Sequence, residues 1–216
     1  IDYKHIGSRP VRPDGVDKVT GRAEFGGDVS LPGMIIGKIL RSPHAHARIK
    51  SIDITDALAI PGVHAVITGE DFPGGGISGE IDGEGGGSIS DQAKNVIARD
   101  KVLYHGHALA AVAAISDRAA DRALDAIKVE YEVLSPVLDI LEAIDPDSVL
   151  VNENNYTKLP EKPDRPSNIA NVGNLVRGDI QEGFERADII IEREYVCPMT
   201  HQGYIEPHSC LASVDE

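Results

Sequence analysis

The side chains best suited to metal or nucleophilic chemistry lie near the end of the sequence: Cys197, His201, His208 and Cys210. Zinc accepts all four, but structural zinc sites use two close pairs with short, fixed spacings. Here Pro198 interrupts the first pair, and the second pair lies on an expected strand. Cys197 and His201 could instead form a nucleophilic pair, although no third group in the sequence would orient the histidine. We therefore favour small, buried thiols, assign no metal ligand, and keep an independent zinc protein as a lesser alternative.

A glycine-rich stretch, residues 74–79, satisfies the dinucleotide-binding pattern G-x-G-x-x-G. This pattern binds a pyrophosphate only between a strand and the start of a helix, and no helical periodicity follows it here. The nearby carboxylates of Glu80, Asp82 and Glu84 would also repel a phosphate. We therefore expect a flexible loop over residues 73–90 rather than a nucleotide site.

Two histidine pairs, His44 with His46 and His105 with His107, stand beside turn signals. A proline and the following strand require a turn at the first pair, and Gly106 permits one at the second. No third metal ligand lies close to either pair in the sequence. Ordinary hydrogen bonds at bends are therefore the favoured interpretation for these histidines.

Composition excludes several partners. The 216 residues have a formal net charge of -14, from 35 acidic side chains against 21 Lys and Arg, whereas nucleic acids and anionic membranes attract basic proteins. No apolar run approaches the roughly 18 residues that a membrane span needs, and no secretory signal is recognisable. Two cysteines provide no disulfide framework and fit a reducing compartment. We expect a cytoplasmic protein that binds no nucleic acid and does not span a membrane.

The elements that must position these side chains are read from hydrophobic periodicity, which predicts an α/β fold. Residues 109–115 are apolar on both faces, which predicts a central strand. A helix capped by Ser116 follows, and we expect it to form a β-α-β unit with the strands on either side. The expected strands are residues 34–40, 47–54, 63–68, 102–104, 109–115 and 128–133, with a short helix at 56–60.

A proline-rich stretch separates this domain from the rest of the chain. Five prolines within residues 135–167 predict a linker that runs extended over a surface. Beyond it we expect a short helix at 178–188 and strands at 189–196 and 209–214. A last strand without a visible partner exposes its backbone, so we expect a fragment or one part of a larger assembly.

Six stretches, taken together and in order, carry a family resemblance. They are residues 14–23 (DGVDKVTGRA), 40–47 (LRSPHAHA), 60–63 (IPGV), 98–102 (ARDKV), 129–134 (VEYEVL) and 201–208 (HQGYIEPH). The set resembles the N-terminal part of the large, molybdopterin-binding subunit of molybdenum hydroxylases. This is the family of xanthine dehydrogenase, aldehyde oxidoreductase and 4-hydroxybenzoyl-CoA reductase.

The resemblance implies a fold and its segments. The fold class would be α/β (α+β), with an N-terminal α/β-hammerhead domain over residues 14–135 after an extended arm at residues 1–13. A Pro-rich linker at residues 136–166 would lead to the incomplete beginning of the first molybdopterin-binding domain at residues 167–216.

The resemblance also implies an activity with cofactors and partners. Enzymes of this family hydroxylate a heteroaromatic ring or an aldehyde with oxygen from water, at a molybdenum-molybdopterin centre expected in its cytosine dinucleotide form. Electrons pass to iron-sulfur clusters and FAD on partner chains. The expected partners are the remainder of the molybdopterin subunit, an iron-sulfur subunit, an FAD subunit and a small-molecule substrate.

The family's catalytic motifs come later than residues 201–208, and none is present in this sequence. We therefore assign no catalytic residue. His201, Gln202 and Glu206 are candidates for orienting groups around the cofactor, against the alternative of a buried, hydrogen-bonded corner. For the whole chain, the alternative to an enzyme portion is a non-catalytic hammerhead module for binding or assembly.

Overall fold

The computed structural model describes residues 4–72, 80–81, 87–88, 95–159, 161 and 163–214. The glycine pattern at 74–79 lies outside these residues. The chain divides into a larger unit, Ile35–Gly178, and a smaller unit made of Ile1–Met34 and Asp179–Glu216. Among the described residues, no helix is long and apolar enough to cross a membrane.

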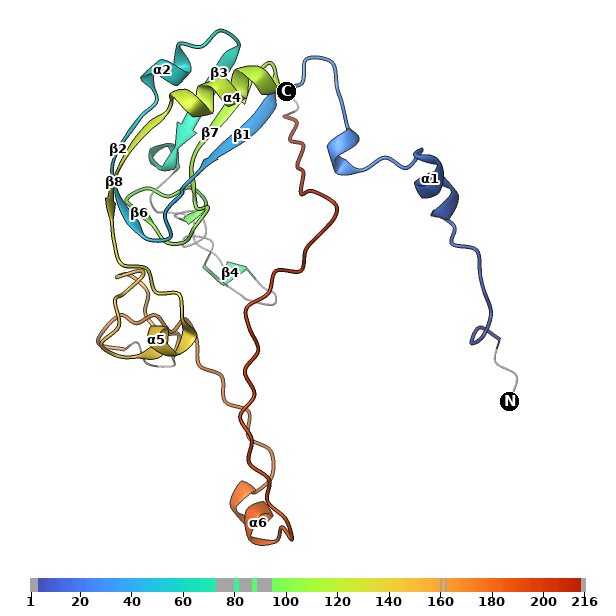
Figure 1. The fold of residues 1–216 in the computed structure, drawn as a ribbon, viewed down its shortest axis with the longest axis vertical. Helices are drawn as coiled ribbons and strands as arrows, with labels where there is room; N and C mark the ends of the chain where they lie inside the picture. The colour runs from blue at the N-terminus through green and yellow to red at the C-terminus, as the bar shows by residue number, and fades with distance from the viewer. Residues whose placement is uncertain are drawn as a thin grey trace. The chain divides into compact units, whose positions relative to one another are not determined.

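The larger unit contains two three-stranded antiparallel sheets (Figure 1). The first has the order β1-β7-β3, with β1 at Ile36–Arg41, β7 at Ala108–Ala114 and β3 at Val63–Thr68. The second has the order β6-β2-β8, with β6 at Lys101–Val102, β2 at Ala47–Asp53 and β8 at Lys128–Val133. The mixture of helices and strands confirms the expected fold class, and the central position of β7 is also confirmed.

The expected β-α-β unit is wrong. α4 (Asp117–Ala126) connects β7 to β8, but these two strands belong to different sheets. Both edges of β7 are already paired, with β1 on one side and β3 on the other. No edge of β7 is therefore left for a parallel neighbour, and β8 pairs with β2 instead.

Small side chains allow α4 to pack closely on the first sheet. Its N-terminus is capped by Ser116, whose Oγ accepts a hydrogen bond of 3.3 Å from the Ala119 N–H, as the sequence predicts. The α2 helix (Thr55–Leu58), which confirms the helix expected at 56–60, buries Ala57 beside it. The fully or nearly fully buried residues of this core are Ala57, Val66, Ala110, Val112, Ala114, Ala119, Ala120, Ala123 and Ile127.

A second, smaller core joins the two sheets. It contains buried Ala47 of β2, Val102 of β6 and Leu109 of β7, together with Ala98. The short helix η2 (Gly69–Asp71) comes very close to this core, because a Cβ on Gly69 would lie 2.7 Å from the carbonyl oxygen of Ala98. Two further short strands, β4 (Glu80–Ile81) and β5 (Gly87–Ser88), pair with each other.

The proline-rich stretch after β8 folds on itself, so the expectation of an extended path is wrong. It contains α5 (Ile140–Ile144), and side-chain amides hold parts of it together. Asn168 donates hydrogen bonds of 3.3 and 2.9 Å to the carbonyls of Ala143 and Val149 and accepts one of 2.9 Å from the Val151 N–H. These side-chain bonds satisfy backbone groups that a helix or sheet would otherwise pair.

The smaller unit contains α1 (Gly15–Thr20), η1 (Gly26–Asp28) and α6 (Ile180–Glu185). α6 confirms the helix expected at 178–188. The strands expected at 189–196 and 209–214 are wrong, since the described residues there adopt no regular structure. Every described residue from 171 to 214 is exposed, and a strand needs a neighbour for its backbone hydrogen bonds.

Candidate functional site

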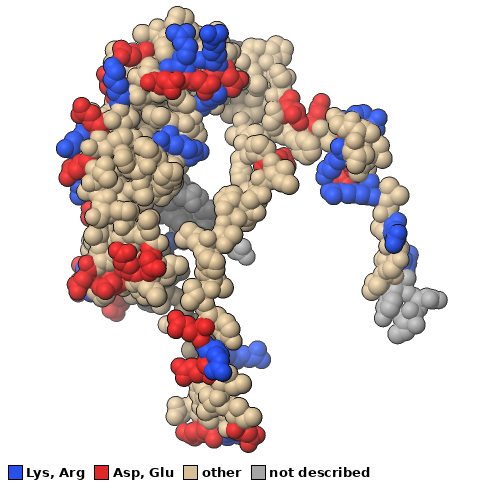
Figure 2. All heavy atoms as spheres, in the orientation of Figure 1, with Lys and Arg blue, Asp and Glu red and all other residues tan. Residues whose placement is uncertain are grey.

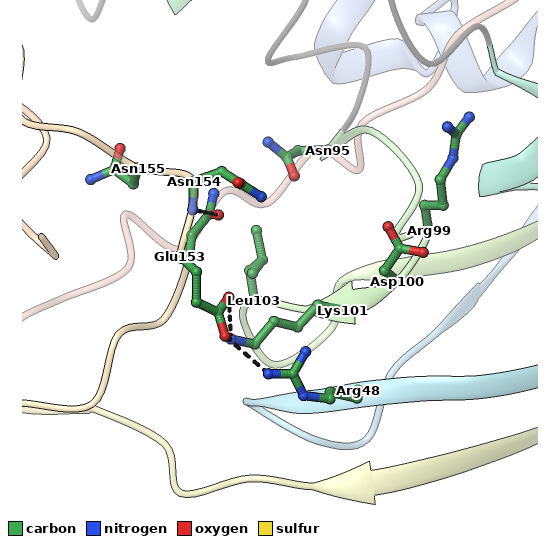
Figure 3. Close-up of a pocket in the computed structure, with 10 residues that line it drawn as sticks. Arg48, Asn95, Arg99, Asp100, Lys101, Leu103, Glu153, Asn154 and Asn155 are labelled. Atoms are coloured by element: carbon green, nitrogen blue, oxygen red, sulfur yellow. Dashed lines mark hydrogen bonds and ion pairs between the residues drawn. The ribbon is translucent and has the colours of Figure 1, made fainter. Parts of the chain in front are cut away.

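A polar cleft of about 820 Å³ in the larger unit is the candidate site (Figure 3). It lies where β6 and β2 face residues 145–159, which we call the stretch after α5. The residues that line this polar cleft are Arg48, Asn95, Arg99, Asp100, Lys101, Leu103, Asn152, Glu153, Asn154 and Asn155.

Two cations meet in this cleft because of strand register. Arg48 of β2 stands directly opposite Lys101 of β6 in the antiparallel pair. Like charges in that position repel and destabilise a sheet. Glu153, from the stretch after α5, offsets this repulsion: Lys101 Nζ lies 2.9 Å from each of its carboxylate oxygens, and Arg48 Nη2 lies 3.1 Å from Oε1 (Figure 3).

The three charges differ in exposure. The Lys101 side chain is 11% exposed, whereas those of Glu153 and Arg48 are 46% and 53% exposed. The hydrogen bond from Lys101 is the main cause that lowers the pKa of Glu153, so this carboxylate is ionised at neutral pH. The resulting cluster fastens the stretch after α5 to the second sheet.

Arg99 closes another side of the cleft. Its Nε and Nη2 donate to the Gly69 carbonyl at 3.1 and 2.9 Å, and Nη2 also donates to the Phe72 carbonyl. This guanidinium therefore holds the end of η2. The cleft offers amides and cations for polar or anionic groups, and among the described residues that line it there is no Ser, Thr, Cys or His that could act as a nucleophile.

The interpretation of the histidines as hydrogen-bonded turn residues is confirmed for His46 and His107. His46 is 3% exposed, and its Nδ1 donates to the Ser135 carbonyl at 2.7 Å. His107 is fully buried: its Nδ1 accepts a bond of 3.2 Å from the Leu103 N–H, and its Nε2 donates to the Asn95 carbonyl at 2.8 Å. Burial lowers the pKa of His107, which keeps the ring neutral.

The other two histidines lie outside the core. The ring of His44, which is half-buried, packs edge-on against Tyr131 with centroids 4.8 Å apart. His105 is exposed in the turn before β7. Neither arrangement gathers metal ligands, and the described residues contain no group of three His, Cys, Asp or Glu side chains that could hold a metal.

The C-terminal candidates lie on exposed chain. Cys197 and Cys210 are both exposed, so the expectation of buried thiols is wrong, because the residues around them pack on no core. The Tyr204 ring lies 5.9 Å from that of His201 and 5.2 Å from that of His208. His201 Nδ1 accepts a hydrogen bond of 2.9 Å from the backbone N–H two residues later. Gln202 and Glu206 are exposed.

Sequence reasoning missed Glu153, which the structure places at the centre of the polar cleft. It lies 105 positions from Arg48 in the sequence. It sits in a stretch without hydrophobic periodicity, where an exposed acid carries no local signal. No signal in the sequence pointed to it, because the opposition of Arg48 and Lys101 that Glu153 offsets is set by the strand register.

Comparison with known proteins identifies the family. Residues 20–135 match the model described as aldehyde oxidase and xanthine dehydrogenase, a/b hammerhead domain. The chain belongs to this family. Residues 161–216 match the molybdopterin cofactor-binding domain, so the resemblance inferred from the six motifs is confirmed.

Sequences of related proteins align with nearly the whole length of this hammerhead family member. It is 36% identical over 202 residues to a probable xanthine dehydrogenase subunit from Bacillus subtilis (strain 168), covering 94% of this chain and 24% of that protein. It is 33% identical over 214 residues to the nicotinate dehydrogenase large molybdopterin subunit of Eubacterium barkeri, covering 99% and 45%. The chain thus spans about a quarter to less than half of these relatives.

The fold has solved counterparts. Quinoline 2-oxidoreductase from Pseudomonas putida 86 matches with a TM-score of 0.56 and 34% sequence identity, over 68% of this chain and 19% of that one. In the present chain, the residues matched to the cofactor-binding domain do not fit a molybdopterin site on their own. Those described from 171 to 214 are exposed and form no cradle for a pterin, so no reaction step is assigned to them.

Proposed function

We propose that this chain is the N-terminal portion of the large subunit of a molybdenum-pterin oxidoreductase that hydroxylates a heteroaromatic or aldehyde substrate with water-derived oxygen. The observation that carries the proposal is the order of the two domain matches, hammerhead at 20–135 and cofactor-binding domain at 161–216. Similar proteins named nicotinate dehydrogenase and quinoline 2-oxidoreductase favour a heteroaromatic substrate. We place the domain limits at residues 14–135 and 167–216, with the linker between them.

The proposed cofactor is molybdopterin, as its cytosine dinucleotide form, with iron-sulfur clusters and FAD on separate subunits. Relatives named as a large chain and as part of a dehydrogenase complex support an assembly of several chains. When bound, the cofactor supplies oxygen transfer and accepts the substrate's electrons. The role that we propose for the described residues is structural, because the ion pairs of Glu153 tie the stretch after α5 to the hammerhead sheets. Free, exposed cysteines support a reducing, cytoplasmic location.

His201, Gln202 and Glu206 are proposed to orient groups around the cofactor, because they lie in the motif 201–208 within the matched cofactor-binding domain. In the holoenzyme, Glu206→Gln should change the molybdenum electron paramagnetic resonance spectrum and lower kcat. A matched change at Glu192, outside the motif, should leave both unchanged. An unaltered spectrum and kcat in Glu206→Gln would remove this role.

Native mass spectrometry with elemental analysis tests the proposed function. The purified large subunit should be found with other chains and stoichiometric molybdenum. It should oxidise at least one of nicotinate, quinoline, xanthine or benzaldehyde with an artificial electron acceptor, and heavy oxygen from labelled water should appear in the product. A protein that purifies alone and free of molybdenum would refute the enzymatic function and favour the non-catalytic module.

A further inference from the structure

An exposed apolar stripe runs along α5. Ile140 and Leu141 are 68% and 70% exposed, Ile144 is 53% exposed, and Leu138 just before the helix is 77% exposed. Residues three or four positions apart share one side of a helix, so Ile144 lies on the same side as Ile140 and Leu141. Contiguous apolar side chains with this exposure are typical of interaction sites.

The stripe leads to a hollow of about 250 Å³. Ile144 belongs to both, because it also lines the hollow. The other apolar side chains of its lining are Ala143, Pro146, Leu150, Leu159, Pro163, Pro166 and Ile169. We call the stripe and this hollow the α5 surface. An apolar pocket beside an exposed apolar stripe suits a partner that inserts one anchoring side chain.

Carboxylates surround the α5 surface. Asp139, Glu142, Asp145 and Asp147 are all exposed, and Figure 2 shows acidic side chains gathered over this part of the larger unit. Asp139 is fixed as the helix cap, since its Oδ1 accepts from the N–H groups of Leu141 and Glu142 at 2.8 and 3.0 Å. Arg165 also lines the hollow and contributes one positive charge. The rim is therefore mainly negative.

We propose that the α5 surface docks a partner subunit through a segment that carries an apolar anchor flanked by Lys or Arg. Charge decides between occupants: a second copy of this chain, with a net charge of -14, would bring like charges to an acidic rim. A basic segment complements the rim, and the anchor fills the hollow. The proposal rests on the proposed function, which supplies redox subunits as the partners.

The test uses the full-length large subunit and the chains that co-purify with it. Leu141→Asp should weaken the affinity of the large subunit for its partners about tenfold or more, because it places a charge at the centre of the contact. Leu58→Asp is the matched control, since Leu58 is 49% exposed on another short helix of the same unit, and it should change the affinity less than about twofold. Glu142→Lys should slow association and reduce its dependence on salt.

Hydrogen exchange on the wild-type protein provides a second readout that needs no variant. Backbone amides of α5 should exchange more slowly in the complex than in the isolated large subunit. Equal exchange in both would overturn the proposal: slow exchange in both states would show that the rest of the same polypeptide covers α5, and fast exchange in both that nothing does. A molybdenum-loaded complex that is insensitive to Leu141→Asp would overturn the docking surface alone, whereas a metal-free subunit without partners would overturn the proposed function as well.

Discussion

Replacing Glu153 by glutamine tests whether its ion pairs hold the stretch after α5 against the second sheet. The substitution keeps the size of the side chain and removes its charge. Lys101 and Arg48 then face each other across β6 and β2 without an anion between them. We expect the stretch to detach more often, while the two sheets and their cores stay folded.

The expected size follows from the exposure of the three side chains. A fully exposed ion pair contributes about 0–1 kcal/mol, whereas leaving a buried charge unpaired costs about 3–5 kcal/mol. Lys101 is 11% exposed, but Glu153 and Arg48 are about half exposed and screened by solvent. We therefore expect a loss of about 1–2 kcal/mol in local stability, equivalent to a roughly 5–30-fold larger population of the open form.

Hydrogen exchange of the backbone amides at residues 149–156 in the full-length subunit measures this opening directly. Exchange in Glu153→Gln should be faster at low salt, and added salt should accelerate the wild type more than the variant. Glu130→Gln on β8 is the matched control, because it removes the same charge from a residue outside the ion pairs found in the described chain. Equal exchange in Glu153→Gln and wild type, or equal acceleration in the control, would refute the reasoning.

Four further outcomes are expected, one from the Glu153 ion pairs and three from buried contacts of the larger unit. Because its pKa is lowered on folding, Glu153 should stabilise the stretch above the ordinary glutamate range and lose this contribution as the pH falls through its folded pKa, as exchange at decreasing pH would show. His107→Phe should destabilise the larger unit by about 1–3 kcal/mol in denaturant unfolding, since the Leu103 N–H and the Asn95 carbonyl lose their hydrogen bonds to the buried ring. Because burial lowers the folded pKa of His107, the wild type should lose stability as the pH falls below about 6.5. The His107→Phe variant should not show this loss. Gly69→Ala should cost about 1–3 kcal/mol, measured by thermal unfolding, because its Cβ would meet the Ala98 carbonyl at 2.7 Å; an unchanged midpoint would contradict the close approach.

Local patterns located most elements of the hammerhead domain. The alternation at residues 47–54 and 128–133 predicted β2 and β8 to within a residue, and Ser116 marked the start of α4. These predictions succeed because each element buries one face on a core within the same unit. The cleft was not predictable in the same way, since Glu153 meets Arg48 across 105 positions and β6 contributes just two residues.

The failed strand predictions show why periodicity alone cannot decide such segments. Residues 189–196 are as apolar and β-branched as β8, yet Ile189 and Ile191 are 79% and 74% exposed in irregular chain. The difference is the neighbour: β8 pairs with β2 over six positions, whereas the described residues provide no strand beside 189–196. A strand's backbone N–H and C=O groups are satisfied by another strand, so hydrophobic alternation specifies which face a strand would bury, and tertiary pairing determines whether it forms.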